Sequence, residues 1–209
     1  MKGMFSGCTS LTSIVFEQFN GENVKDISYL FAGCNSIKTI DMRYFNSKEL
    51  IKMNNCFQGC KSLTSLILTN LNTSKVIDIS LLFYNCSSIS SVTTNIFNTK
   101  NAVNMSKMFY NCTSLRSINI KTFDTQNVID MSGMFYNVRS MSALDITNFD
   151  THNVIDMSFM FYYCNTLTSL KLRYFNVLKV TDMSYMFSYC IKLSSLDIYN
   201  FYIKLSKFI

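Results

Sequence analysis

The sequence predicts an α/β solenoid, in which short repeated units stack side by side. A 26-residue pattern recurs through the 209 residues without insertion or deletion. We take Phe123–Asn148 as the reference unit and number its residues as positions 1 to 26. A constant period of this length is typical of solenoids, because each unit buries its apolar face on its neighbours.

Phenylalanine residues mark the predicted core. Fifteen of the 18 Phe residues occupy only positions 1 and 13 of the unit. Equivalent positions lie at the same depth in every unit, so we expect continuous ladders of buried rings. Position 13 is Phe in all eight units: Phe5, Phe31, Phe57, Phe83, Phe109, Phe135, Phe161 and Phe187.

The first half of each unit predicts a short helix. Positions 9, 12, 13 and 16 are apolar, which is the spacing of one helix face. Position 8 is Asp in five units and suits a helix N-cap, whereas position 15 is Gly or Asn in the first six units and suits a helix stop. Tyr163 and Tyr189 replace Gly or Asn in the last two units, and the pattern gives no reason for them.

The second half of each unit predicts a strand. Positions 19, 22 and 24 form a Leu-x-x-Leu-x-Leu string, as in Leu167, Leu170 and Leu172. Such a string is the strand segment of a leucine-rich repeat. One strand per unit predicts a parallel sheet of about eight strands on the concave face of a horseshoe, with the short helices on its convex face.

The domain organisation follows from the repeats. We expect residues 1–200 to form one array of 26-residue repeats and residues 201–209 to form a partial repeat or tail. Met1 aligns with position 9, so the first unit is truncated. This alignment favours a fragment, or a start assigned at an internal Met, with the array continuing at the N-terminus.

One repeat carries a family resemblance. The unit FDTHNVIDMSFMFYYCNTLTSLKLRY, Phe149–Tyr174, resembles the repeat of BspA-type leucine-rich repeat surface proteins, which is also found in mycoplasma lipoproteins. The resemblance covers residues 1–200, and Asn-Val-x-Asp-Met-Ser-x-Met-Phe is specific to it. It implies export or surface display, adhesion and binding of host proteins. The matching residues belong to the scaffold, so the resemblance implies no binding residues.

Seven of the eight cysteines occupy position 16, and Cys56 alone lies elsewhere. Equivalent side chains on stacked units point the same way, whereas a disulfide needs Cβ atoms turned toward each other. Val138 fills the same position in one unit, and the short Cys pairs of zinc sites do not occur. We therefore expect a ladder of buried, reduced thiols. Unpaired thiols argue mildly against an oxidising compartment.

Signals for catalysis, cofactors, metals, membranes and nucleic acid are weak. His152 is the single histidine and falls in a predicted exposed turn, and no catalytic or phosphate-binding motif occurs. No apolar run approaches the ~18 residues that span a bilayer. The net charge is +6, with Lys and Arg spread over most unit positions instead of one block. We expect no enzyme, no cofactor, no metal, no nucleic-acid partner and no membrane span in this segment.

The variable residues of the predicted concave face are the candidate partner-binding site. A constant scaffold with variable projecting side chains is how solenoids form extended binding surfaces. The plainer alternative is that these side chains are merely solvated strand residues. The candidates, at positions 23 and 25, are Asp41, Arg43, Asn119, Lys121, Asp145, Lys171, Arg173, Asp197 and Tyr199.

Two functions remain open from the sequence. The first is a non-enzymatic protein-binding or adhesion module at the cell surface or secreted, with a host or extracellular-matrix protein as candidate ligand. The second is a cytoplasmic interaction scaffold or effector of the same fold, which the unpaired thiols favour.

Overall fold

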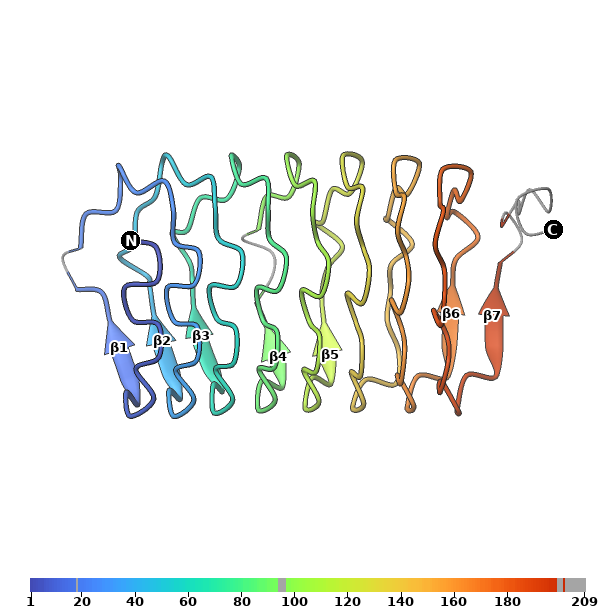
Figure 1. Ribbon diagram of the computed structural model, residues 1–209, viewed down its shortest axis with the longest axis horizontal. Helices are drawn as coiled ribbons and strands as arrows, with labels where there is room; N and C mark the ends of the chain where they lie inside the picture. The colour runs from blue at the N-terminus through green and yellow to red at the C-terminus, as the bar shows by residue number, and fades with distance from the viewer. Residues whose placement is uncertain (18, 94–96, 199–200, 202–209) are drawn as a thin grey trace.

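The computed structural model describes residues 1–17, 19–93, 97–198 and 201 as a row of stacked units (Figure 1). Each strand covers positions 21 to 23 or 21 to 22 of its unit. The strands are β1 (Ser13–Val15), β2 (Thr39–Asp41), β3 (Ser65–Ile67), β4 (Ser91–Val92), β5 (Ser117–Ile118), β6 (Ser169–Lys171) and β7 (Ser195–Asp197).

The strands pair in parallel with a register of one unit. Ile14 of β1 lies opposite Ile40 of β2, which lies opposite Leu66 of β3. The described strands form three sheets, β1-β2-β3, β4-β5 and β6-β7. In the unit between β5 and β6, Ala143 makes an isolated bridge to Ser169. The predicted parallel direction is confirmed, but the described ladder is interrupted where one continuous sheet was expected.

The predicted helices at positions 9 to 16 are wrong for the described residues, which contain no helix. Backbone N–H groups at odd positions donate to the next unit, as Phe83 does to the Met108 carbonyl at 2.9 Å. Many at even positions close turns within the unit, as Tyr84 does to the Leu81 carbonyl at 3.1 Å. An α-helix would need these donors for its own turns.

Backbone conformation accounts for the turns. Positions 11 and 15 have positive φ in all eight units, including Lys107 at 55° and Asn111 at 57°. Two left-handed residues four apart prevent a right-handed helix. Gly and Asn at position 15 therefore mark a left-handed residue within a chain of turns, and Tyr163 and Tyr189 adopt the same conformation, with φ of 61° and 62°.

The spacing between units explains why turns form where helices were expected. Parallel strands lie about 4.8 Å apart, whereas a helix with its side chains is about 10 Å wide. The turn segments are hydrogen-bonded unit to unit, as are the strands, so both faces share one spacing. The usual cause of horseshoe curvature, wide helices on one face, is absent from the described residues, and the units form a straight row in the view of Figure 1. We therefore write strand face and turn face for the two sides.

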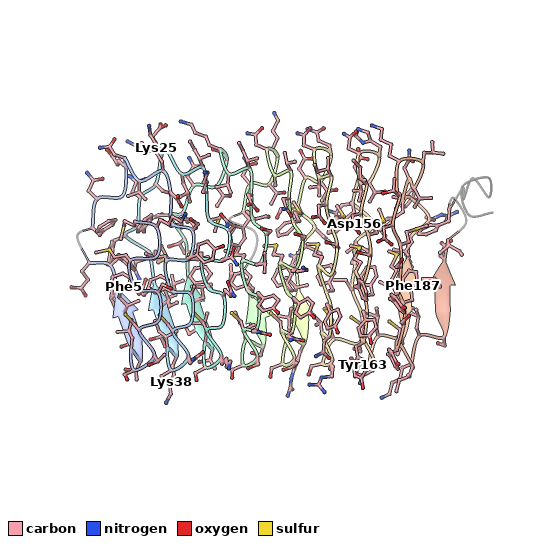
Figure 2. The ribbon with its side chains drawn as sticks, in the orientation of Figure 1. Phe5, Lys25, Lys38, Asp156, Tyr163 and Phe187 are labelled. Carbon is pink, nitrogen blue, oxygen red and sulfur yellow. The ribbon has the colours of Figure 1, made fainter. Side chains whose placement is uncertain are left out.

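Stacked phenylalanines form the core between the two faces. Neighbouring position 13 rings, from Phe5 to Phe187, lie 5.4 to 6.0 Å apart between centroids and are nearly parallel. Phe109 is fully buried within this ladder. The two labelled ends of the ladder, Phe5 and Phe187, lie at mid-height of the array in Figure 2. The predicted position 13 ladder is confirmed.

A buried hydroxyl ladder at position 3 accompanies the rings. Thr99 is 3% exposed, and its hydroxyl donates to the Asp124 carbonyl at 2.9 Å and accepts from the Asp124 N–H at 2.8 Å. Ser47, Thr73, Thr125 and Thr151 make the same pair of bonds to their next units. A buried hydroxyl is tolerated here because it is satisfied as both donor and acceptor.

The buried ring ladder predicts a large cavity cost. Phe109→Ala removes a fully buried ring between Phe83 and Phe135, and we expect a loss of about 3–5 kcal/mol in unfolding free energy. Chemical denaturation measures it. Tyr174→Ala, at a side chain that is 62% exposed, is the control and should change little. A loss below about 1 kcal/mol for Phe109→Ala would contradict a tightly packed core.

The left-handed turns predict that a substitution to glycine stabilises the protein at these positions, although it usually destabilises. Lys107→Gly should stabilise the array by up to about 1 kcal/mol, because glycine adopts positive φ without steric cost. Lys100, which is exposed and has no positive φ, provides the control, and Lys100→Gly should destabilise. Thermal melts of both variants give the readout. A similar loss for both would indicate an ordinary right-handed backbone at residue 107.

Candidate functional site

The strand face carries the residues predicted for partner binding. Each described strand begins with an exposed Ser or Thr at position 21, and Ala143 takes this place in the unit without a strand. Position 23 projects from the same face as position 21, because alternate residues of a strand point to one side. Position 25 lies beyond the strands, and ion pairs place Arg43 beside Asp41 and Lys121 beside Asp145. The face therefore consists of a track of small side chains beside two rows of variable ones.

Most of the charged residues predicted to bind a partner form ion pairs with one another. The Arg43 guanidinium lies 2.7 Å from the Asp41 carboxylate, and its hydrogen bonds hold the pKa of Asp41 below its usual value. Lys121 pairs with Asp145 of the next unit at 3.4 Å. A hydrogen bond from the Thr147 hydroxyl, assisted by its backbone N–H and by Lys121, lowers the pKa of Asp145.

The remaining residues predicted to bind a partner differ in their contacts. Arg173 lies 3.9 Å from Asp197 of the next unit, and the Asn119 side chain accepts a hydrogen bond from the Lys121 N–H. Lys171 is exposed and, among the described residues, has no acidic partner within ion-pair distance. Tyr199 lies outside the described residues. The structure thus joins three cation–acid pairs that the sequence suggested only as separate charges.

A hollow of about 510 Å³ opens on the strand face beside the interrupted unit. Its lining includes Ile118, Ala143, Asp145, Thr147 and Lys171. The small Ala143 side chain lies where other units have Ser or Thr, and no full strand forms there. The hollow combines an apolar floor with one paired carboxylate and the cation of Lys171. Sequence reasoning missed it, although the single Ala at position 21 was a signal.

The structure offers little chemistry at His152. Its Nδ1 lies 2.7 Å from the Asp150 carboxylate and its Nε2 lies 2.8 Å from the Asn153 amide. Although partial burial opposes it, hydrogen bonding to His152 lowers the pKa of Asp150. Neither neighbour is the Ser, Thr or Cys nucleophile that a histidine base activates. No group of three metal-ligating side chains and no membrane-spanning helix occurs in the described part of the chain.

The comparisons with known proteins fit this geometry. The model of a family described as "Mycoplasma protein of unknown function, DUF285" matches residues 1–118 and 104–205. The chain belongs to this family. A solved leucine-rich repeat protein of T. pallidum matches with a TM-score of 0.56 at 19% identity, covering 87% of this chain and 77% of that one. At this identity the likeness shows the fold, a leucine-rich repeat solenoid.

A second solved structure, a leucine-rich cell surface protein of Faecalibacterium prausnitzii, has a TM-score of 0.44 at 15% identity. It covers 93% of this chain, which spans 62% of that protein. No curated protein sequence matches the chain. The resemblance of the repeat to BspA-type leucine-rich repeat proteins is confirmed by the mycoplasma family and by the shared fold.

The position 16 cysteines form a thiol ladder. All eight cysteines are free, and all except Cys8 are buried. Each buried ladder thiol donates to the carbonyl of the preceding unit's position 13 Phe, as Cys112 does to Phe83 at 3.1 Å. Val138 replaces the thiol in one unit and is fully buried as well. The expected burial is confirmed for every cysteine except Cys8.

Burial makes these thiols poor nucleophiles. It raises the pKa of Cys164 to about 12 and that of Cys112 further. The thiolate is the reactive form, so both cysteines stay protonated and inert near neutral pH.

The ladder predicts strongly unequal thiol reactivity. With a thiol reagent at neutral pH, Cys8 should react at once and the seven buried cysteines only after unfolding. Reagent uptake in native and denatured protein measures this, and Cys8→Ser should abolish the fast phase. Disulfides between successive ladder cysteines in mass spectrometry, or several fast thiols, would contradict the reduced ladder.

Proposed function

We propose that residues 1–200 form a single non-enzymatic protein-binding array whose strand face contacts the partner. The leucine-rich repeat fold supports a role in protein interaction, since solenoids present extended surfaces of this kind. The hollow beside Ala143 carries the proposal, because it combines apolar floor, hydrogen-bonding groups and one unpaired cation. The partner is a host or extracellular-matrix protein, and the array acts in adhesion at the cell surface or after secretion.

A cytoplasmic interaction scaffold is the second candidate. The free thiols favour it, because unpaired cysteines are commoner in reducing compartments. Burial and raised pKa values would also protect the same thiols outside the cell. The two candidates share the strand face and differ in the partner, so one set of variants serves both.

The charges of the strand face favour a protein partner over a nucleic acid. Arg43, Lys121 and Arg173 each have an acidic neighbour within 4 Å, so the face has little unpaired positive charge. Mixed and locally paired charges suit a partner that also carries both signs. We expect Lys171, which has no such neighbour among the described residues, to contact an acidic side chain.

The test fills the hollow without touching the core. Ala143→Arg places a long side chain in the hollow, and Lys171→Glu reverses its cation. Each should weaken binding about tenfold or more, because a buried interface centre contributes about 2 kcal/mol or more. Binding of the full chain is measured against a panel of purified extracellular-matrix proteins and against cytosolic extract.

Gln126→Arg serves as the matched control, because this exposed residue lies at position 4, away from the strand face. It adds the same charge as Ala143→Arg and should leave both binding and melting temperature unchanged. If Ala143→Arg and Gln126→Arg bind a partner equally well, the strand face is not its binding surface. A partner from the matrix panel supports adhesion, whereas one from cytosol alone supports the scaffold.

A further inference from the structure

Acidic residues are confined to one part of the repeat. Positions 9 to 20 contain seven of the 19 Lys and Arg residues but none of the 13 Asp and Glu residues. The spread of Lys and Arg over the unit does not reveal this asymmetry, because it lies in the distribution of the acids. Once the units stack, the asymmetry becomes a strip of single-sign charge along the array. The seven cations are Lys2, Lys38, Lys61, Lys107, Arg116, Arg139 and Lys192.

All seven cations are exposed, and none takes part in an ion pair found among the described residues. Five of them follow the turn segment, at positions 17 to 20. We call these five, Lys38, Lys61, Arg116, Arg139 and Lys192, the basic edge. Figure 2 shows Lys38 on this edge, opposite Lys25.

The opposite edge carries acids as well as cations such as Lys25 and Lys100. There Lys48 pairs with Glu22 and Lys75 pairs with Glu49, each at 2.7 Å. Paired charges cancel over a short distance, whereas a row of unpaired cations attracts anions along its length. From Lys38 to Lys192 the basic edge crosses six unit steps, or about 29 Å at the spacing of parallel strands. Its complement is therefore a long, linear anion.

Aromatic side chains adjoin the basic edge at one end. Tyr162, Tyr163 and Tyr189 contact one another with centroids 5.2 to 6.0 Å apart, and Phe159 stacks on Tyr185 at 5.1 Å. Tyr163 is labelled at the same edge as Lys38 in Figure 2. These five residues form the aromatic cluster, of which Tyr185 and Tyr189 are 61% and 58% exposed.

The aromatic cluster is held at a conformational cost. Phe159, Tyr163, Tyr185 and Tyr189 have φ between 56° and 62°. Bulky residues rarely adopt this region, and at position 15, which Tyr163 and Tyr189 occupy, the other six units have Gly or Asn. Backbone strain that persists at exposed side chains is typical of functional surfaces. The large exposed aromatic area beside unpaired cations also indicates a binding surface.

The surroundings of the basic edge suit some classes of linear anion better than others. Many backbone N–H groups near the edge are already used, as when Arg116 donates to the Ser90 carbonyl at 3.0 Å, so a peptide gains little by pairing its backbone. Tyr110 and Tyr136 stack on each other at 4.0 Å, so the faces between them are closed to nucleic-acid bases.

Hydroxyl groups of the edge favour a sugar. Ser140 and Thr166 donate to the Thr113 and Arg139 carbonyls at 2.7 and 2.8 Å, which leaves their oxygen atoms as acceptors. A polysaccharide brings hydroxyl donors for these acceptors together with anionic groups for the cations. Its rings also offer C–H faces to exposed tyrosines.

We propose that the basic edge binds a linear anionic polysaccharide that runs along the array and packs against the aromatic cluster. This site adjoins the starts of the strands but uses residues other than those of the strand face, and it does not depend on the protein-binding role. One chain therefore has two independent binding surfaces, one for each kind of partner.

Heparin is the probe, with neutral dextran as its uncharged counterpart. Titration of the full chain should show heparin binding that weakens as salt rises, since salt screens exposed charges, and no binding of dextran. The edge variant, Lys61→Gln with Arg116→Gln and Arg139→Gln, should lose roughly tenfold or more in affinity. Tyr163→Gly, which removes a ring but suits a positive φ, should also weaken binding while the protein stays folded.

The matched control is Lys25→Gln with Lys100→Gln and Lys179→Gln, which removes the same charge from positions 4 to 7, away from the basic edge. It should retain affinity, as should Ala143→Arg on the strand face. Equal losses in the edge and control variants would mean attraction by net charge only and would overturn the proposal. Tighter binding of polyglutamate or of single-stranded DNA than of heparin would overturn it in favour of those classes.

Discussion

Hydrogen bonds between equivalent segments of successive units determine the whole array. They run along the strands, as between β1 and β2, and along the turn segments, as from Phe83 to Met108. Because the register is always one unit, each side chain packs on its own counterpart. Every buried position must therefore hold a residue that stacks on itself. Phe rings do so by offset stacking, and Thr hydroxyls do so by donating and accepting toward the next unit.

The same constraint should penalise like charges at one position, and position 8 shows how the penalty is reduced. Asp130, Asp156 and Asp182 belong to consecutive units and are joined by backbone bridges. Each carboxylate accepts a hydrogen bond from the N–H two residues later, at 2.7 or 2.8 Å. Bonds from the hydroxyl and N–H of Ser184 hold the pKa of Asp182 below its usual value. Local donors thus stabilise each charge, which keeps a row of carboxylates compatible with stacking.

Sequence patterns predicted what stacking repeats and missed what the backbone conformation decides. The period, the position 13 ring ladder and the buried thiols follow from spacing alone, because equivalent residues share one environment. The helix did not form because position 11 is left-handed, and Tyr29, Leu81 and Lys107 at that position carry no signal for it. On the strand face the variable charges were predictable, but their pairing across units, as between Lys121 and Asp145, depends on side-chain geometry.

Stacking also explains why the two edges of the array differ electrostatically. Where a position carries both signs in neighbouring units, as with Glu49 and Lys75, the charges lie close enough to pair. Between positions 9 and 20 no acid is available in any unit, so no such pairing across units can arise there. Lys61 and Arg139 accordingly take part in no ion pair among the described residues. A row of exposed, unpaired cations attracts anions, and this attraction is the basis of the polysaccharide site that we propose.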